Sequence, residues 1–115
     1  MKLYKFDQNN SGGSFIIDEK LTHRVIIEAL TYEGAISKAE DLGVYFNGVD
    51  EGVDCPCCGD RWGYPDRLDF PLKWNNETFF NCADTYLQHL ASEFGIKGVD
   101  IRLFMNNGDI KEFTK

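Results

Sequence analysis

The chain has 115 residues, which is enough for one domain with its own hydrophobic core. Hydrophobic residues make up 43% of the chain and aromatic residues 14%, so a folded domain is expected rather than a disordered polypeptide. The net charge of −7 repels phosphate backbones, and no stripe of lysine and arginine interleaves with the aromatic residues. We therefore do not expect a nucleic acid partner.

The beginning of the chain predicts neither export nor membrane insertion. Residues 1–7 alternate between polar and apolar side chains, and no apolar run approaches the roughly 20 residues of a membrane span. We therefore expect a cytoplasmic protein without membrane contact. In the cytoplasm, the four cysteines are expected to be reduced thiols or metal ligands rather than disulfides.

Three strands are predicted in the first part of the chain. Residues 2–7 alternate, which is typical of a strand with one buried face, and residues 14–18 form a second short apolar run. A turn-rich segment, residues 8–13, separates the two. Residues 24–30 are rich in β-branched side chains and predict the clearest strand.

A helix is predicted directly after the third strand. Thr31 is a typical N-cap residue, and Gly43 is a typical C-terminal stop. We therefore expect the helix to begin after Thr31 and to end before Gly43. Between these two residues, apolar side chains recur at helical spacing at Ala35, Ile36, Ala39 and Leu42.

The middle of the chain, residues 45–73, predicts a long ordered loop. It holds all three prolines and many acidic residues and glycines, without a sustained hydrophobic period. A second helix is expected to begin at Asn75 or Asn76 and to end at Gly95. Its apolar stripe consists of Phe80, Ala83, Leu87, Leu90 and Phe94.

The C-terminal part of the chain predicts a β-hairpin. Residues 99–105 alternate, Asn107-Gly108 is a strong signal for a type I′ turn, and residues 109–114 form the returning strand. The sequence as a whole predicts a single α+β domain over residues 1–115. We expect about five short, mostly antiparallel strands with two helices on one face of the sheet, and a long central loop that contains cysteines.

The segment 54–62, Asp-Cys-Pro-Cys-Cys-Gly-Asp-Arg-Trp, is the most distinctive of the chain. It contains the Cys-Pro-x-Cys-Gly pattern of a zinc knuckle, in which the two outer thiolates, here Cys55 and Cys58, point at one metal ion. A structural zinc site needs four ligands, and the chain has no second Cys-x-x-Cys. The remaining candidate ligands are Cys57, Cys82, His23 and His89.

The spacing of these candidates argues against a complete zinc site. Cys82 and His89 are seven residues apart on one helix face, which separates their Cα atoms by about 10 Å. Donor atoms on one zinc ion lie within about 4 Å of each other. We therefore expect no metal cofactor and partly buried, metal-free thiols. A zinc site and a redox-active dithiol remain the alternatives.

A second candidate site is the glycine-rich segment Asn10-Ser11-Gly12-Gly13. Consecutive small residues allow backbone N–H groups to converge on a phosphate or a carboxylate. The segment is not a P-loop, because neither Gly-Lys-Ser/Thr nor a helix follows it. The alternative is a plain connection between two strands.

The segment 60–67 alternates guanidinium groups with aromatic rings. Arg61 and Arg67 can pair with phosphate, and Trp62 and Tyr64 can stack on a base. Together with the glycine-rich segment, these four residues form the predicted ligand-binding site. In the alternative interpretation, Trp62 anchors the loop to the core and Arg61 pairs with a nearby aspartate.

Catalytic motifs are missing from the sequence. Neither His23 nor His89 lies in a nucleophile motif, and no His-Glu-x-x-His, Gly-x-Ser-x-Gly or Walker pattern occurs. We therefore expect a protein that is not an enzyme.

Three segments together resemble a family of small proteins of tailed bacteriophages. They are Ser11-Gly12-Gly13-Ser14-Phe15, the strand and helix over residues 23–43, and the Cys-rich segment 54–62. The likeness covers about residues 1–65. It implies phage origin and expression in the cytoplasm of a bacterial host, and it implies no particular activity or ligand.

In this context we expect a small accessory binding protein that counteracts host antiphage defence. Such a protein sequesters a nucleotide-type immune signal or binds a defence protein, and the sequence leaves both versions open. The alternatives are a zinc-knuckle module for protein interaction and an acidic mimic of DNA. Association into a homo-oligomer is also left open.

Overall fold

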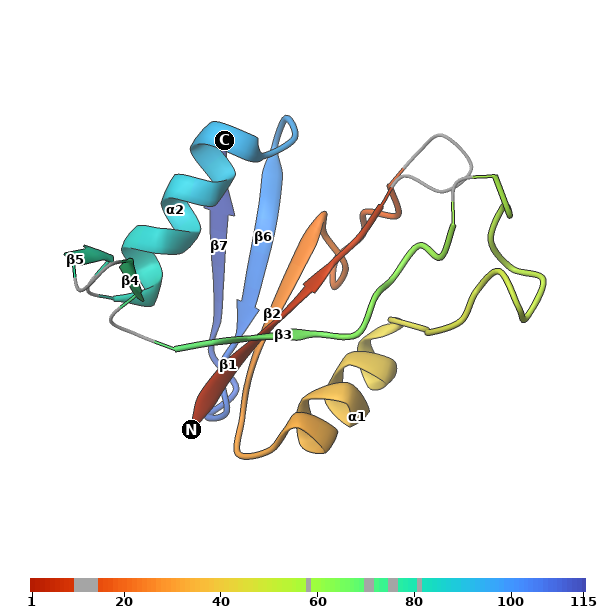
Figure 1. The fold of residues 1–115 in the computed structure, drawn as a ribbon, viewed down its shortest axis with the longest axis horizontal. Coiled ribbons are helices and arrows are strands. Elements are labelled where there is room, and N and C mark those ends of the chain that lie inside the picture. The colour runs from red at the N-terminus through yellow and green to blue at the C-terminus, as the bar shows by residue number, and fades with distance from the viewer. Residues whose placement is uncertain (10–14, 58, 70–71, 75–76, 81) are drawn as a thin grey trace.

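A mixed sheet of five strands forms the centre of the computed structural model (Figure 1). Its spatial order is β3 (Asp66–Leu68), β1 (Lys2–Asp7), β2 (Arg24–Ala29), β6 (Val99–Phe104) and β7 (Ile110–Thr114). β2 and β6 pair in parallel, whereas the other neighbours pair antiparallel. This is the predicted α+β class with a largely antiparallel sheet. The structure describes residues 1–9, 15–57, 59–69, 72–74, 77–80 and 82–115.

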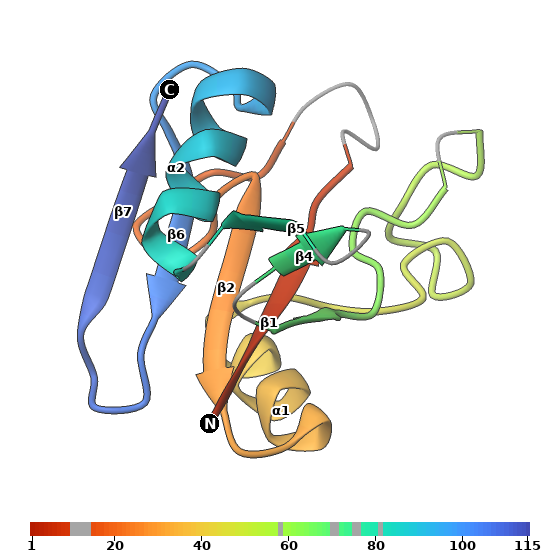
Figure 2. The ribbon, with the colours of Figure 1, turned by 60° about the vertical axis from the view of Figure 1, so that its left-hand side comes forward.

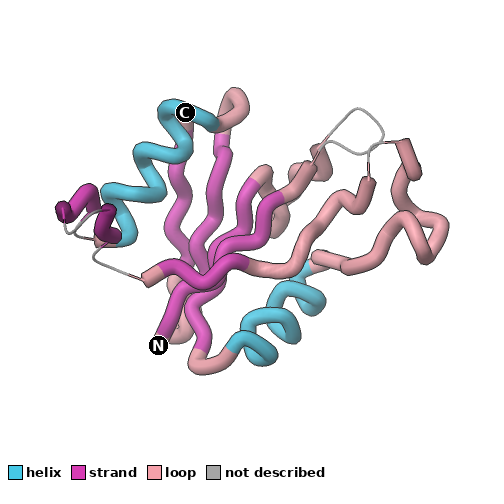
Figure 3. The backbone as a smooth tube through the Cα atoms, in the orientation of Figure 1, coloured by secondary structure: helices cyan, strands magenta, loops and turns pink. Residues whose placement is uncertain are grey.

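The central strand β2 is buried on both faces of the sheet. Val25, Ile26 and Ile27 are fully buried, and the side chains of successive strand residues point to opposite faces. Val25 and Ile27 pack with α1 (Tyr32–Leu42), whereas Ile26 packs with α2 (Ala83–Phe94). The helices therefore cover opposite faces, with the strands between them (Figure 3). The predicted arrangement of both helices on one face is wrong.

The helix α1 begins and ends where the sequence predicts. The Thr31 Oγ1 accepts a hydrogen bond from the Gly34 N–H at 3.0 Å, which satisfies one of the N–H groups that a helix start leaves unpaired. At the other end, Gly43 has a φ of 113°, and its N–H donates to the carbonyls of Ala39 and Glu40. A φ in this left-handed region favours glycine. Both predicted ends of the helix are confirmed.

The helix α2 begins later than predicted. Its N-cap is Cys82, and Glu77–Phe80 instead form the strand β5, which pairs antiparallel with β4 (Leu72–Trp74). The Thr-Phe-Phe sequence within β5 favours a strand because β-branched and aromatic residues fit a pleated surface. The predicted cap residues Asn75 and Asn76 lie outside the described residues.

Both helices are short, with 11 residues in α1 and 12 residues in α2. α2 ends before Gly95, as predicted, and the Gly95 N–H donates to the Ala91 carbonyl at 3.2 Å. Within the described ranges, no helix has the length and apolar character needed to cross a membrane.

The connections differ from the prediction at three places. Residues 15–18 form no strand, and β3 lies within the predicted central loop. In the last hairpin, the Met105 carbonyl accepts from the Gly108 N–H at 3.0 Å. Gly108 has a φ of 96°, but Asn107 does not have a positive φ. A type I′ turn requires two such residues in succession, so the predicted turn type is wrong.

Thr31→Ala is expected to lower the free energy of unfolding by about 1 kcal/mol, because the Gly34 N–H loses its acceptor. Thr31→Ser is the matched control, since it keeps the hydroxyl group. Urea unfolding followed by circular dichroism measures both variants. Equal stability of the two variants would contradict the observed cap.

Candidate functional site

The buried side chain of Gln8, directly after β1, joins the two loop regions that the sequence singled out. Its Nε2 donates to the carbonyls of Ile16 and Thr22 at 3.0 and 3.1 Å, and its Oε1 accepts from the Ile16 N–H and from Arg61 Nη1. The Asn9 N–H donates to the Arg61 carbonyl at 2.8 Å. The chain on both sides of the glycine-rich segment is therefore held beside Arg61. The predicted anion-binding residues themselves, Asn10, Ser11, Gly12 and Gly13, lie outside the described residues.

The carboxylate of Asp54 organises the segment 44–65, which connects α1 to β3. It accepts hydrogen bonds from the Arg61 N–H and the Tyr45 hydroxyl, each at 2.7 Å, and lies 3.9 Å from Arg61 Nε. A Cβ atom at Gly48 would collide with this carboxylate, so glycine makes room for it. Burial and the hydrogen bond to Asp54 raise the pKa of Tyr45. The hydroxyl therefore keeps its proton for this bond.

Arg61 and Trp62 both point into the protein. Arg61 is 9% exposed, and its Nη1 lies 3.0 Å from Gln8 Oε1. Trp62 is 1% exposed and belongs to the same hydrophobic cluster as Phe6 and Ala39. These positions agree with the alternative interpretation, in which Trp62 anchors the segment and Arg61 pairs with an aspartate. Neither side chain is presented to a ligand at the surface.

Tyr64 presents an exposed aromatic ring. It is 58% exposed and stacks on Phe46, with ring centroids 4.7 Å apart and an angle of 1° between the ring planes. Phe46 in turn contacts the buried Phe6, with centroids 6.2 Å apart. The stack holds the exposed ring in one orientation relative to the core. We call Phe46 and Tyr64 the aromatic platform.

Arg67 is exposed on the edge strand β3. Its Nη2 lies 3.0 Å from Asp69 Oδ2, and Lys2 Nζ lies 3.2 Å from Oδ1 of the same carboxylate. A hydrogen bond from Lys2 and the nearby charge of Arg67 lower the pKa of Asp69. Arg67 is therefore at the surface, where it already pairs with a carboxylate that it shares with Lys2.

Among the described candidate metal ligands, Cys55 and Cys57 lie together, whereas Cys82, His89 and His23 lie elsewhere, with His23 bonded to Asp100. The Sγ atoms of Cys55 and Cys57 are 2.7 Å apart, and Cys58 lies outside the described residues. Cys82 is the N-cap of α2 and His89 lies on that helix, far from the yellow-green segment that holds the two thiols (Figures 1 and 2). In the part of the chain that the structure describes, no three histidine, cysteine or acidic side chains are placed to hold one metal ion.

The sequence did not predict the buried ionic cluster around Asp100. Its carboxylate is fully buried and lies 2.6 Å from Arg24 Nη1, 2.7 Å from His23 Nδ1 and 3.0 Å from the Ile96 N–H. Burial opposes ionisation, but the bonds from His23 and Ile96 and the charge of Arg24 outweigh it and lower the pKa of Asp100. The cluster joins the starts of β2 and β6 to the end of α2. In the sequence, Asp100 lies between the apolar residues Val99 and Ile101, and this alternation gives no signal for a buried carboxylate.

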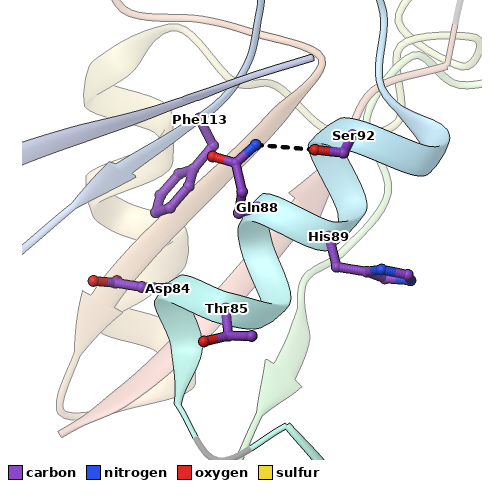
Figure 4. A pocket seen from close by; sticks show the side chains of 6 residues that line it. All are labelled: Asp84, Thr85, Gln88, His89, Ser92 and Phe113. Carbon is purple, nitrogen blue, oxygen red and sulfur yellow. Dashed lines mark hydrogen bonds between the residues drawn. The ribbon is translucent and has the colours of Figure 1, made fainter.

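An open groove of about 690 Å³ runs along α2 (Figure 4). Gln88 Nε2 donates to Ser92 Oγ at 3.1 Å and to the Thr114 carbonyl at 2.9 Å. Figure 4 shows that the lining side chains point in different directions rather than toward one centre. The groove is lined by Asp84, Thr85, Gln88, His89, Ser92 and Phe113.

A second hollow of about 310 Å³ lies between α1 and the β6–β7 hairpin. Its lining includes the apolar side chains of Ile27 and Phe104, together with Lys38. Lys38 Nζ donates to Asn106 Oδ1 at 3.1 Å. Four of the predicted binding residues belong to the described part of the chain, and they line neither hollow: Arg61, Trp62, Tyr64 and Arg67.

Trp62→Ala is expected to cost about 3–5 kcal/mol of stability, because it empties a buried aromatic position. Tyr64→Ala, two residues further along the chain, is the matched comparison. It is expected to cost about 1 kcal/mol or less, because the exposed ring loses one stacking contact. Chemical denaturation of the purified variants measures the difference. Similar losses in both variants would contradict the inward position of Trp62.

Asp100→Asn is expected to cost about 3–5 kcal/mol at pH 7, because Arg24 loses its buried partner. The pKa of Asp100 is lower in the folded protein than in the unfolded chain. Its ionised form therefore stabilises the fold above the ordinary pKa of about 3.9, and this stabilisation is lost as the pH falls through the folded pKa.

The variant should accordingly lose less additional stability on acidification than the original protein does. Denaturation at a series of pH values between neutral and acid measures both, with Asp41→Asn on the exposed side of α1 as the control. Parallel pH profiles for the original protein and Asp100→Asn would refute the role of this carboxylate.

Comparison with known proteins identifies the family of the chain through a family model. No curated protein and no solved structure matches the chain significantly. A family model described as a domain of unknown function (DUF7296) matches residues 1–115. The chain therefore belongs to the DUF7296 family.

Proposed function

We propose that this is a non-enzymatic binding protein that contacts a partner protein through the aromatic platform. The observation that carries the proposal is the Tyr64 ring, which is 58% exposed and held flat on Phe46. An exposed side chain that is already ordered loses little conformational freedom on binding. Tyrosine is also among the residue types that contribute most binding energy at protein interfaces.

Acidic side chains accompany the platform on the segment 44–65. Asp50, Glu51 and Asp60 are exposed there, and the net charge of the chain is −7. A surface of this kind attracts a partner with exposed lysines and arginines and repels a polyphosphate. We therefore infer a partner protein with a basic surface.

Capture of a nucleotide has less support. Arg61 and Trp62, which were the predicted groups for phosphate and base, make their contacts inside the protein. Tyr64 and Arg67 remain at the surface, but Arg67 shares a carboxylate with Lys2. The test must therefore distinguish binding of a nucleotide from binding of a partner protein.

The resemblance to proteins of tailed phages suggests where the partner acts. A phage accessory protein works in the cytoplasm of the bacterial host, where defence proteins are available targets. We infer that the platform binds a host defence protein and blocks it by covering its surface. Such inhibition requires no chemical step from the residues of this chain.

A photo-cross-linking amino acid at position 64 is expected to form a covalent adduct with one host protein in cells that express the chain. The same amino acid at Leu30, which is 74% exposed in the β2–α1 connection, is the matched control. Once the adduct is identified, calorimetry measures the affinity. Tyr64→Ala should weaken binding by about 30-fold, which corresponds to the loss of about 2 kcal/mol at an interface hot spot.

Three results would oppose the proposal. The first is equal cross-linking at positions 64 and 30, and the second is unchanged affinity of a folded Tyr64→Ala variant. The third is a nucleotide that mass spectrometry identifies in the purified protein and that the Tyr64→Ala variant no longer retains. That result would make a small molecule the ligand of the platform.

A further inference from the structure

Cys55 and Cys57 bring two sulfur atoms unusually close together, with Sγ atoms 2.7 Å apart. Thiolates that share a tetrahedral zinc ion, with bonds of about 2.3 Å, lie about 3.8 Å from each other. The sulfur atoms of a disulfide are about 2.05 Å apart. The separation of this pair is therefore closer to the covalent distance than to the distance between two zinc ligands.

The local backbone keeps the two cysteines adjacent. Pro56 lies between them, and its ring restricts φ to a narrow range. The Gly59 N–H donates to the Cys55 carbonyl at 3.1 Å, and Gly59 has a φ of 83°. A side chain would oppose that backbone conformation. The pair consequently lies in a tight turn, so closing it into a disulfide orders little additional chain.

The two thiols differ in their exposure. Cys57 is exposed, whereas Cys55 is half-buried. A small-molecule disulfide therefore reaches Cys57 first, while Cys55 is held beside it. This difference assigns the attacking role to Cys57 and the resolving role to Cys55.

We propose that Cys55 and Cys57 form a reversible redox pair that glutathione disulfide converts to an intramolecular disulfide. Cys57 loses its proton, and its thiolate attacks one sulfur of glutathione disulfide, forming a mixed disulfide and expelling a glutathione thiolate. Cys55 then loses its proton and attacks Cys57 Sγ, which forms the protein disulfide and expels the second glutathione thiolate. The two expelled thiolates take up the two protons, so the dithiol is oxidised by two electrons and glutathione disulfide is reduced.

This reaction does not depend on the partner of the aromatic platform. In a reducing cytoplasm the pair remains a dithiol, and it becomes a disulfide when the proportion of glutathione disulfide rises. The proposed pair also differs from the cysteine pair of a zinc knuckle, which in this sequence consists of Cys55 and Cys58.

The test uses the full chain with Cys58→Ser and Cys82→Ser, so that only the proposed pair remains among the four cysteines. Cys82 is removed because it is exposed, and a hydrogen bond with Thr85 lowers the pKa of its thiol, which favours the thiolate form that attacks disulfides. After treatment with glutathione disulfide, the intact mass should decrease by two hydrogens, with no glutathione attached and no thiol left to alkylate. Dithiothreitol should restore both thiols.

The matched control adds Cys55→Ser, which should stop the reaction at the glutathione adduct on Cys57. Thermal melts check that each variant folds, and alanine replaces serine where a serine variant does not. The proposal is overturned if the two-cysteine variant keeps both thiols or ends with glutathione adducts only. In the unaltered protein, a disulfide to Cys58 instead, or bound zinc that protects the thiols from alkylation, would also overturn it.

Discussion

Burial of β2 on both faces is the constraint on which the rest of the fold depends. Val25, Ile26 and Ile27 are consecutive and fully buried, and each such side chain gains about 1.5–3 kcal/mol from leaving water. Two layers of cover are needed, and α1 and α2 supply them from opposite sides. The parallel pairing of β2 with β6 also requires a long crossover connection. Between α1 and α2, which cover opposite faces of the sheet, the chain forms the edge strand β3.

The segment 44–65 belongs to this crossover and contains no helix or named strand. Hydrogen bonds from side chains hold it in place. Buried backbone groups that have no ladder partner need partners from side chains. Asp54 accepts from the Arg61 N–H and the Tyr45 hydroxyl, and Gln8 bonds to backbone groups of the preceding connection and to Arg61. In the segment 44–65, Asp54 therefore holds the backbone at Arg61, and Asp60 Oδ1 accepts from the Val49 N–H at 2.9 Å. Gln8 joins the Arg61 side chain to the connection before β2.

Sequence patterns predicted the elements that carry a local signal, either an alternation of polar and apolar residues or a cap residue. The alternation over residues 2–7 locates β1, and Thr31 and Gly43 locate both ends of α1. The start of α2 could not be predicted in the same way, because residues 77–80 pair with β4, a partner that helical spacing does not reveal. The sequence does contain a signal for the placement of the two helices on opposite faces of the sheet. An uninterrupted apolar run is typical of a strand covered on both faces, and β2 contains one.

Arginine and aromatic side chains serve equally well as internal anchors and as recognition groups. The composition of residues 60–67 therefore could not predict which ring faces solvent. Trp62 pairs with Gln8 beyond the end of β1 and turns into the core, whereas Tyr64 lies outside this pairing with its ring on Phe46. Phe46 also contacts the buried Phe6, so the exposed ring is continuous with the hydrophobic core. A partner that covers Tyr64 would extend a packed aromatic stack, which is why this ring and not Trp62 is suited to recognition.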